Sequence, residues 1–355
     1  MISIGLMSGT SLDGVDVALI DSDGVEVSHQ GPAQTFPYPE PLRESLRAVL
    51  GGVGPVSEVE RDMTLFHARS VEMFMDIHGI GREHVEVVGF HGHTISHAPE
   101  RRHTWQIGDG GLLAKTLGLA VVNDFRSRDV AEGGQGAPLV PVYHAALAHA
   151  LDGPVAVVNI GGVANVTWLG KAGAVLAFDT GPGNALIDDW ARRHLGTAVD
   201  QDGRLALLGT ADAQAVATFL DHPYFTQKPP KSLDRDDFAR LAGAVTEGLS
   251  PADGAATLTA ITARSIARSR DHFPLAPARW LVTGGGRHNP ALMAALRAEI
   301  DAPVAAVEEV GWDGDGLEAQ AFAFLAVRSL KGLPITFPET TGAPGPLTGG
   351  RLHLP

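Results

Sequence analysis

The stretch that decides the fold is Ile2-Ser3-Ile4-Gly5-Leu6-Met7-Ser8-Gly9-Thr10-Ser11-Leu12-Asp13-Gly14-Val15-Asp16-Val17-Ala18-Leu19-Ile20. Residues 2–7 and 15–20 are typical of short strands, and residues 8–14 are typical of a turn. The chain therefore opens with a β-hairpin rather than with a strand, a turn and a helix. The same pattern returns where apolar residues 155–160 and 166–169 flank Gly161-Gly162-Val163-Ala164-Asn165. We infer a repeat of whole domains.

The bulk composition is that of an ordinary globular protein. The chain has 355 residues, 44% of them hydrophobic and 19% charged, and this length favours two domains. The net charge of −14 argues against a nucleic-acid partner, because phosphate backbones select basic surfaces. Without cysteine, disulfides, thiolate nucleophiles and cysteine-bound zinc are excluded. No apolar run reaches the ~18 residues of a membrane span, and no basic leader precedes the first strand. We expect a soluble cytoplasmic protein with no membrane partner.

Local signals place several further elements. Ser57 and Glu60 have capping-box spacing ahead of a periodic apolar pattern, which predicts a long helix. Asp109 is expected to cap a helix that ends at Gly118, and Asn289 a helix with proline at its first position. Buried strands are expected at residues 85–90, 120–123 and 281–283.

A breaker cluster, Gly133-Gly134-Gln135-Gly136-Ala137-Pro138, suggests where the domains divide. We place an N-terminal domain at residues 1–133 and a C-terminal domain at residues 134–333. The tail 334–355 is rich in proline and glycine, shows no obvious element and is expected to pack back on the first domain.

Three glycine-rich tips are candidates for holding phosphate. Gly9 and Gly14 have the Walker A spacing, but Val15 and Asp16 replace the lysine and hydroxyl residue, so a P-loop is rejected. A dinucleotide-binding fingerprint also finds no support. Backbone N–H groups of such tips can cradle phosphate oxygens, and the carboxylate of Asp13 suits Mg²⁺. With the second hairpin and residues 284–286, these tips predict one nucleotide in a cleft between two domains.

Seven ordered motifs between Ile2 and Leu330 resemble one family. The chain is similar to anhydro-N-acetylmuramic acid kinases, which belong to the actin, hexokinase and heat-shock-chaperone ATPase superfamily. The seven motifs that carry the similarity are residues 7–16, Phe90-His91-Gly92-His93-Thr94, Gln106-Ile107-Gly108-Asp109, Asn159-Ile160-Gly161-Gly162-Val163-Ala164-Asn165, Phe178-Asp179-Thr180-Gly181-Pro182-Gly183-Asn184, Thr283-Gly284-Gly285-Gly286-Arg287-His288-Asn289 and Leu317-Glu318-Ala319-Gln320-Ala321-Phe322-Ala323. The resemblance implies an α/β protein of two ribonuclease-H-like (actin-like ATPase) domains with the nucleotide cleft between them.

The resemblance also implies an activity. Such an enzyme uses ATP and Mg²⁺ to open 1,6-anhydro-N-acetylmuramic acid with water and to phosphorylate O6. The product, N-acetylmuramic acid 6-phosphate, belongs to peptidoglycan recycling and amino-sugar catabolism. The only partner implied is the small sugar substrate, and the resemblance is compatible with a homodimer.

The functional residues carried over from the family fall into four groups. Asp179 is the catalytic base, and Asp13 is the metal ligand. The sugar-binding candidates are Thr94, Arg126, Asn184 and Glu318. The nucleotide-binding candidates are Gly9, Thr10, Ser11, Leu12, Asp13, Gly14, Val15, Asp16, Gly161, Gly162, Asn165, Gly284, Gly285, Gly286 and Asn289.

Without the resemblance, plainer interpretations of these residues stand. Asp179 follows an apolar stretch, which suits a turn-former or a helix cap as well as a strand-end carboxylate. Arg126 has Asp124 and Asp129 close by for a surface ion pair. Glu318 suits the first turn of a helix on dipole grounds alone.

The histidines in His91-Gly92-His93, with His97 four residues on, raise the alternative of a zinc hydrolase. Such a site needs three close protein ligands and an open position. The resemblance places this loop against the sugar and assigns it no metal.

One loop departs from the family pattern. Where Lys-Ser-Thr-Gly-Arg-Glu is expected, the chain has Lys231-Ser232-Leu233-Asp234-Arg235-Asp236, so no site residue is assigned there. Two other functions remain as alternatives. One is a kinase of the same fold for an open hexosamine, and the other is a nucleotide-sensing scaffold without sugar-dependent turnover.

Overall fold

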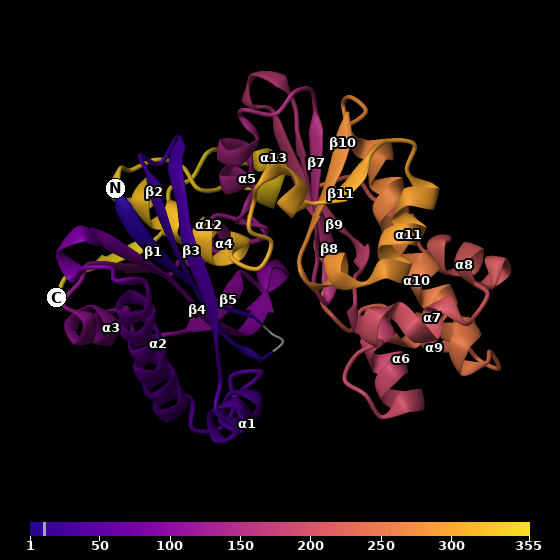
Figure 1. The fold of residues 1–355 in the computed structure, drawn as a ribbon, viewed down its shortest axis with the longest axis horizontal. Helices are drawn as coiled ribbons and strands as arrows, with labels where there is room; N and C mark the ends of the chain where they lie inside the picture. Colours follow the sequence, from indigo (N-terminus) through magenta and orange to yellow (C-terminus); the bar gives the residue numbers. More distant parts are fainter. Residues whose placement is uncertain (10–11) are drawn as a thin grey trace. The chain divides into compact units, whose positions relative to one another are not determined.

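The computed structural model describes residues 1–9 and 12–355. They form two compact units, each built on one mixed sheet (Figure 1). The first unit contains Met1–His149 and Asp315–Pro355, and the second contains Ala150–Gly314.

The sheet of the first unit has the strand order β12-β6-β4-β1-β2-β3, with β5 paired to β4. Strands β1, β4 and β6 are parallel, whereas β2 and β3 continue from β1 as an antiparallel meander. The strands are β1 (Ile2–Ser8), β2 (Gly14–Ser22), β3 (Val27–Pro37), β4 (Val87–Ala98), β5 (His103–Ile107), β6 (Val121–Asn123) and β12 (Arg351–His353).

The sheet of the second unit repeats this arrangement in the order β11-β10-β7-β8-β9. Here β7, β8 and β9 form the antiparallel meander, and β10 and β11 lie parallel to β7. In each unit the first meander strand is central, which is the ribonuclease-H-like order that the family resemblance implied. The strands are β7 (Val155–Ile160), β8 (Val163–Leu169), β9 (Val175–Pro182), β10 (Arg279–Thr283) and β11 (Val304–Ala306).

Helices cover both sheets. Those of the first unit are α1 (Glu40–Ala48), α2 (Val56–His78), α3 (Gly110–Leu117), α4 (Ser127–Ala131), α5 (Pro141–Ala148), α12 (Leu317–Leu330) and α13 (Pro338–Thr341). Those of the second unit are α6 (Ala185–Leu195), α7 (Arg204–Leu207), α8 (Ala213–Leu220), α9 (Ala239–Val245), α10 (Pro251–Arg268) and α11 (Pro290–Glu299).

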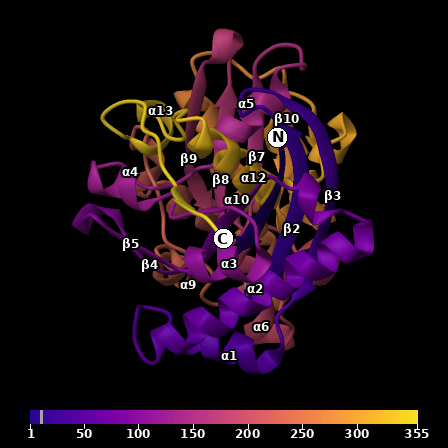
Figure 2. The same cartoon turned by 90° about the vertical axis from the view of Figure 1, so that its left-hand side faces the viewer.

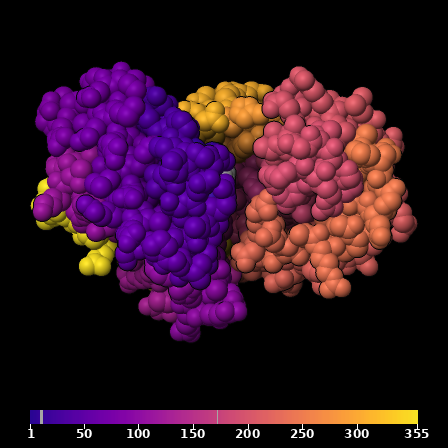
Figure 3. Space-filling model, turned by 90° about the horizontal axis from the view of Figure 1, so that it is seen from below, coloured from indigo at the N-terminus to yellow at the C-terminus, as the bar shows by residue number. Residues whose placement is uncertain are grey.

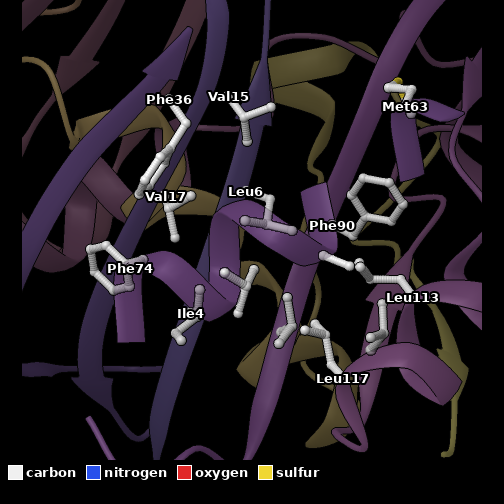
Figure 4. Packing of buried hydrophobic residues seen from close by; sticks show 14 of the residues in the cluster. Ile4, Leu6, Val15, Val17, Phe36, Met63, Phe74, Phe90, Leu113 and Leu117 are labelled. Carbon is white, nitrogen blue, oxygen red and sulfur yellow. The ribbon is translucent and has the colours of Figure 1, made fainter. Parts of the chain in front are cut away.

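Helices cover both faces of the first sheet (Figures 1 and 2), and successive residues of β1 point alternately to these two faces. Ile4 and Leu6 are fully buried in a cluster with Met63 and Phe74 of α2 (Figure 4). Gly5 points the other way, and a Cβ there would lie 1.8 Å from the carbonyl oxygen of Ala319 in α12. Glycine is therefore required for α12 to approach the strand so closely.

The same close approach predicts a large stability effect at Gly89 of β4. A Cβ at this position would lie 2.0 Å from the carbonyl oxygen of Phe322, which belongs to rigid helix backbone. We expect Gly89→Ala to lower the free energy of unfolding by at least about 1–3 kcal/mol, measured by urea titration. Gly345→Ala is the control, because a Cβ there meets nothing within 4 Å. Equal stability of the two variants would contradict this packing.

The division between the units differs from the one expected from the sequence. The glycine-rich segment at 133–138 belongs within the first unit, because Gly134 N donates to Asp129 O (2.8 Å) and Gln135 N to Thr341 O (2.6 Å). The chain leaves the first unit only after His149 and returns at Asp315, so α12 packs on β1 and β4. Glycines that bind back on their own unit cannot be distinguished from a linker by composition.

The C-terminal tail has more structure than its composition suggests. It contains α13 and then β12, which pairs antiparallel with β6. Figure 3 shows the yellow atoms of this last segment against the purple surface of the first unit. The two ends of the chain thus contribute to one sheet.

Local capping signals were reliable at two of three helices. Asp109 accepts from Leu112 N and begins α3, and Asn289 accepts from Leu292 N and begins α11. The predicted capping box at Ser57 and Glu60 is wrong. Helix α2 begins at Val56, and Glu60 Oε1 accepts instead from Gly108 N (2.9 Å), a tertiary contact that outcompetes the local one.

Candidate functional site

The turn between β1 and β2 is the first expected phosphate-holding element. Leu12 N donates to Gly9 O (3.2 Å), and Leu12 has a left-handed backbone with φ of 57°. Its side chain is buried in the core of the first unit, so Leu12 can offer a ligand only backbone groups. The predicted contacts of Thr10 and Ser11 lie outside the described residues.

The start of β2 is fixed against β3. A Cβ on Gly14 would lie 2.4 Å from the carbonyl oxygen of Phe36, so only glycine fits. The side chain of Val15 is fully buried, which limits its predicted nucleotide contact to the backbone.

Carboxylates gather beside this turn. Asp13 is exposed, and Asp16 accepts a hydrogen bond from Thr35 Oγ1 (2.5 Å). Burial raises the pKa of Asp16 to about 6, and the charges of Asp13, Glu318 and Asp315 act in the same direction. Such a concentration of negative charge favours a bound cation.

The donor set suits Mg²⁺ better than a metal that needs many protein ligands. No group of three or more histidine, aspartate or glutamate side chains in the described chain is arranged to hold a metal ion. Mg²⁺ usually keeps several waters and takes one or two carboxylates. Asp13 and Asp16 fit that mode of binding.

Arg126, at the start of α4, lies in a partly buried network. Its Nε and Nη2 are 3.2 and 3.1 Å from His91 Nε2, and Nη1 donates to Gly136 O (2.6 Å). Burial lowers the pKa of Arg126 to about 10, and the charges of Glu318 and Asp129 oppose that shift. The residue therefore remains a cation at neutral pH, held by neutral groups.

The two carboxylates proposed for a surface ion pair with Arg126 have other partners. Asp124 Oδ1 accepts from Ser127 N (3.4 Å). Asp129 is buried and accepts from Gly136 N (2.6 Å) and from Thr341 Oγ1 (2.7 Å). Asp129 thus supports the loop behind Arg126, a role that the sequence did not indicate.

The histidines of the zinc alternative are engaged with protein groups. Nε2 of His91 accepts from Arg126, and its Nδ1 lies 2.9 Å from Gly92 O. Burial, followed by the Arg126 charge, holds the pKa of His91 well below its usual range, so the ring is neutral. His97 Nδ1 lies 2.9 Å from Thr104 Oγ1.

His93 connects β4 to the first turn. Its Nδ1 is 3.0 Å from Ser8 Oγ, which in turn is 2.7 Å from the hydroxyl of Tyr38. Ser8 directly precedes Gly9, so this chain of hydrogen bonds supports the expected phosphate-holding turn. His93 Nε2 is buried and has no hydrogen-bond partner in the described part of the chain.

The remaining sugar candidates of the first unit are Thr94 and Glu318. Thr94 pairs with Gln106 across β4 and β5 and accepts from Gln106 Nε2 (3.2 Å). Glu318 lies partly exposed in the first turn of α12. Its charge acts on both Asp16 and Arg126, so the first unit brings the turn and the sugar candidates into electrostatic contact.

A row of polar residues crosses the sheet of the second unit. Thr283, Asn159, Asn165 and Asp179 are successive partners across β10, β7, β8 and β9. Directly paired residues point to the same face, so their side chains line one face of the sheet. Asn165 thus lies beside the expected catalytic aspartate.

The sequence suggested that Asp179 stands at the end of its strand, but the structure places it within the strand. Strand β9 continues to Pro182, and its register with β8 is irregular. Asp179 and Gly181 pair with consecutive residues of β8, so Thr180 has no partner there and forms a bulge. Such bulges re-aim neighbouring side chains and are common beside active sites.

Asp179 is held by a distant loop. Its N–H donates to Lys231 O (3.1 Å), and its Oδ2 accepts from Leu233 N (2.8 Å). The hydroxyl of Tyr224 donates to Asp179 O (2.5 Å). Burial raises the pKa of Asp179 to about 7, since the opposing effects of the Leu233 N–H and Lys231 are smaller. The sequence missed these partners, although Lys231, retained just before the departures from the family pattern at Leu233 and Asp234, was a signal.

The second glycine tip is bound to the start of α6. Gly161 O accepts from Asn184 N (2.7 Å), and Gly162 O accepts from Gly183 N (2.9 Å). Asn184 Nδ2 donates to Ile160 O (3.0 Å), so this amide supports the tip rather than projecting away from it.

The third tip, Gly284 to Gly286, packs beside β7. Gly284 has φ of 75°, and its Cβ would lie 2.3 Å from Asn159 Oδ1. Gly285 is exposed, and Gly286 is buried against Ile160. Asn289 uses Oδ1 to cap α11, which accounts for this residue without a nucleotide.

No helix among the described residues is both long and apolar enough to cross a membrane. Residues 1–354 match the family described as anhydro-N-acetylmuramic acid kinase.

Curated relatives carry the same description. A protein of Paramagnetospirillum magneticum described as anhydro-N-acetylmuramic acid kinase is 62% identical over 355 residues, covering 100% of both chains. One of Rhodospirillum rubrum with that description is 55% identical and covers 98% of this chain and 93% of its own. Among solved structures, the activator of the 2-hydroxyisocaproyl-CoA dehydratase from Clostridium difficile with bound ADPNP has a TM-score of 0.48 at 13% identity, covering 94% of this chain and 96% of its own.

Proposed function

This chain belongs to the anhydro-N-acetylmuramic acid kinase family, and from that premise we propose that it couples opening of the anhydro bridge to phosphorylation of its sugar. As a kinase of this family it is a phosphotransferase with an alcohol acceptor. The proposed products are N-acetylmuramic acid 6-phosphate and ADP, which would return a peptidoglycan sugar to amino-sugar metabolism.

The proposed step begins with water. Asp179 takes a proton from water, whose oxygen forms a bond to the anomeric carbon. The bond between that carbon and the bridging oxygen breaks, and the bridging oxygen stays on C6. This oxygen then attacks the γ-phosphorus of ATP, ADP leaves, and the proton on Asp179 passes to solvent. One water and one phosphoryl group are thereby added to the sugar.

The observation that carries this proposal is the setting of Asp179. One carboxylate oxygen is fixed by the N–H of Leu233, and the side chain remains partly exposed within β9. Its pKa of about 7 suits a general base near neutral pH. A helix cap or turn-former would need neither feature.

Other residues of this chain would bind and orient the reactants. We propose that Arg126 holds the lactyl carboxylate or a hydroxyl of the sugar, and that Thr94, Glu318 and Asn184 make further contacts to the sugar. The glycine tips would hold the phosphates through backbone N–H groups. Mg²⁺ bound at Asp13 and Asp16 would neutralise charge on the phosphates, since phosphoryl transfer depends mainly on positioning and electrostatics.

The function is tested by ADP release with 1,6-anhydro-N-acetylmuramic acid, N-acetylmuramic acid and N-acetylglucosamine. We expect release with the anhydrosugar. Release only with an open sugar would identify an ordinary hexosamine kinase, and no sugar-dependent release would favour a nucleotide-sensing scaffold.

The pKa of Asp179 predicts the pH dependence of the reaction. The base is active only as the carboxylate, so kcat/KM should fall about tenfold per pH unit below about 7 and level off above it. Asp188→Asn is the control, because burial also raises the pKa of Asp188 to about 6. An acid limb near pH 4, or one that disappears in Asp188→Asn, would contradict the assignment to Asp179.

A further inference from the structure

Strand β9 forms an edge of the second sheet, and the loop around residues 224–233 covers that edge at Asp179. The N–H and C=O of an edge residue normally lack partners on the open side. At Asp179 both are satisfied by this loop, through Lys231 O and the Tyr224 hydroxyl, and Leu233 N binds the carboxylate. Three contacts from one loop therefore fix the backbone and the side chain of the same residue.

Lys231 is unusual within this loop because its ammonium group is buried. Its Nζ donates to Tyr224 O (3.0 Å) and lies 4.5 Å from the ring centre of Tyr224 and 5.6 Å from that of Phe178. Aromatic faces and a carbonyl stabilise a cation without neutralising it. The ammonium group therefore keeps its positive charge. This charge lowers the pKa of Asp179, and the charge of Asp179 raises the pKa of Lys231.

We propose that Lys231 and Tyr224 are positioning residues for the reaction, with Tyr224 holding the strand that carries Asp179 and Lys231 fixing Tyr224 and the loop against that strand. This inference rests on the proposed function of Asp179 as the base. It assigns a role to the loop where the sequence departs from the family pattern. The backbone N–H of Leu233 needs no particular side chain, which explains how the loop tolerates leucine there.

The surrounding charges are consistent with this role. Asp234 and Lys231 are the charged groups that act on Asp179, in opposite directions. Arg268 of α10 acts on Lys231, as does Asp179 itself. The charge of Lys231 lowers the pKa of His272, and the charge of Asp237 raises the pKa of Tyr224. Burial lowers the pKa of Lys231 to about 8, so it is a cation at and below the pH at which Asp179 is half protonated.

The test is the pH profile of kcat/KM for three variants. Lys231→Met removes the charge, so the Asp179 carboxylate becomes easier to protonate and the acid limb should move to higher pH. Lys231→Arg keeps the charge and should restore the limb to its wild-type position. Tyr224→Phe keeps the ring but removes the hydrogen bond, so kcat should fall by roughly threefold to tenfold without movement of the limb.

The matched control is Lys228→Met, an exposed lysine of the same loop whose loss should leave the profile unchanged. Thermal unfolding of each variant identifies any that fail to fold, and the Lys231→Arg comparison then decides. If wild type makes no phosphorylated sugar, the proposed function fails. If wild type makes it and the limb stays in place in folded Lys231→Met, this inference alone is overturned.

Discussion

Asp179→Asn is expected to lose sugar-dependent ADP release by roughly 10²–10⁴-fold, the usual contribution of a general base. Asparagine has the same shape, and its amide oxygen can still accept from Leu233 N, so the loop should stay in place. ATP binding measured by calorimetry should change by less than about threefold, since the change removes a proton acceptor and no phosphate contact.

Stability gives an independent check on the same variant. Because burial raises the pKa of Asp179 to about 7, the folded protein binds this proton more tightly than the unfolded chain does. The carboxylate therefore costs stability above about pH 4, and that cost grows until about pH 7. Asp179→Asn should thus unfold at the same or a higher temperature than wild type at pH 8.

The control for this prediction is Asp234→Asn, which removes an exposed carboxylate of the adjacent loop. It should keep most of the wild-type rate. If Asp179→Asn retained more than about a tenth of the wild-type rate, Asp179 would not be the base.

Arg126→Met is expected to lower kcat/KM for the anhydrosugar by roughly 10²-fold, because a charged hydrogen-bonding group lost from a polar site is costly. The loss should appear mainly in KM, since Arg126 is proposed to bind the sugar rather than the reacting atoms. The measurement compares the normal substrate with 1,6-anhydro-N-acetylglucosamine, which lacks the lactyl carboxylate. If the guanidinium binds that carboxylate, the variant and wild type should differ little with the second sugar.

An equal loss with both sugars would instead place Arg126 on a hydroxyl. Arg128→Met is the matched control, because Arg128 is an exposed residue of the same helix. Arg126 also donates to Gly136 O, so a loss of about 1 kcal/mol of stability is expected and should be checked by thermal unfolding. A variant with unchanged KM for both sugars would exclude Arg126 from the sugar site.

The sequence predicted the parts of the fold that depend on local patterns. Apolar runs on either side of glycine turns indicated the two hairpins, and Asp109 and Asn289 indicated two helix starts. Glu60 shows where such reasoning fails, because its carboxylate has a choice between a local N–H and Gly108 N. The glycine-rich segment at 133–138 fails for a related reason, since its hydrogen-bond partners lie elsewhere in the first unit.

For the candidate site, sequence resemblance named Asp179 and Arg126 but not their surroundings. The partners of Asp179 lie 45 to 54 residues further along the chain, and His91 is 35 residues before Arg126. Contacts over such separations depend on how the strands and loops pack. The periodicity of apolar residues in the sequence does not predict them. The charge of Lys231 is likewise meaningful only once β9 has placed Asp179 beside its loop.

The measurement that tests the central claim most directly is the mass of the sugar product formed in water enriched in heavy oxygen, with the reaction quenched before the anomeric oxygen exchanges. We predict a product heavier than the anhydrosugar by one phosphoryl group and one water, with the heavy oxygen on the anomeric carbon. A product heavier by the phosphoryl group alone, or heavy oxygen found only in inorganic phosphate, would contradict the coupled opening and phosphorylation.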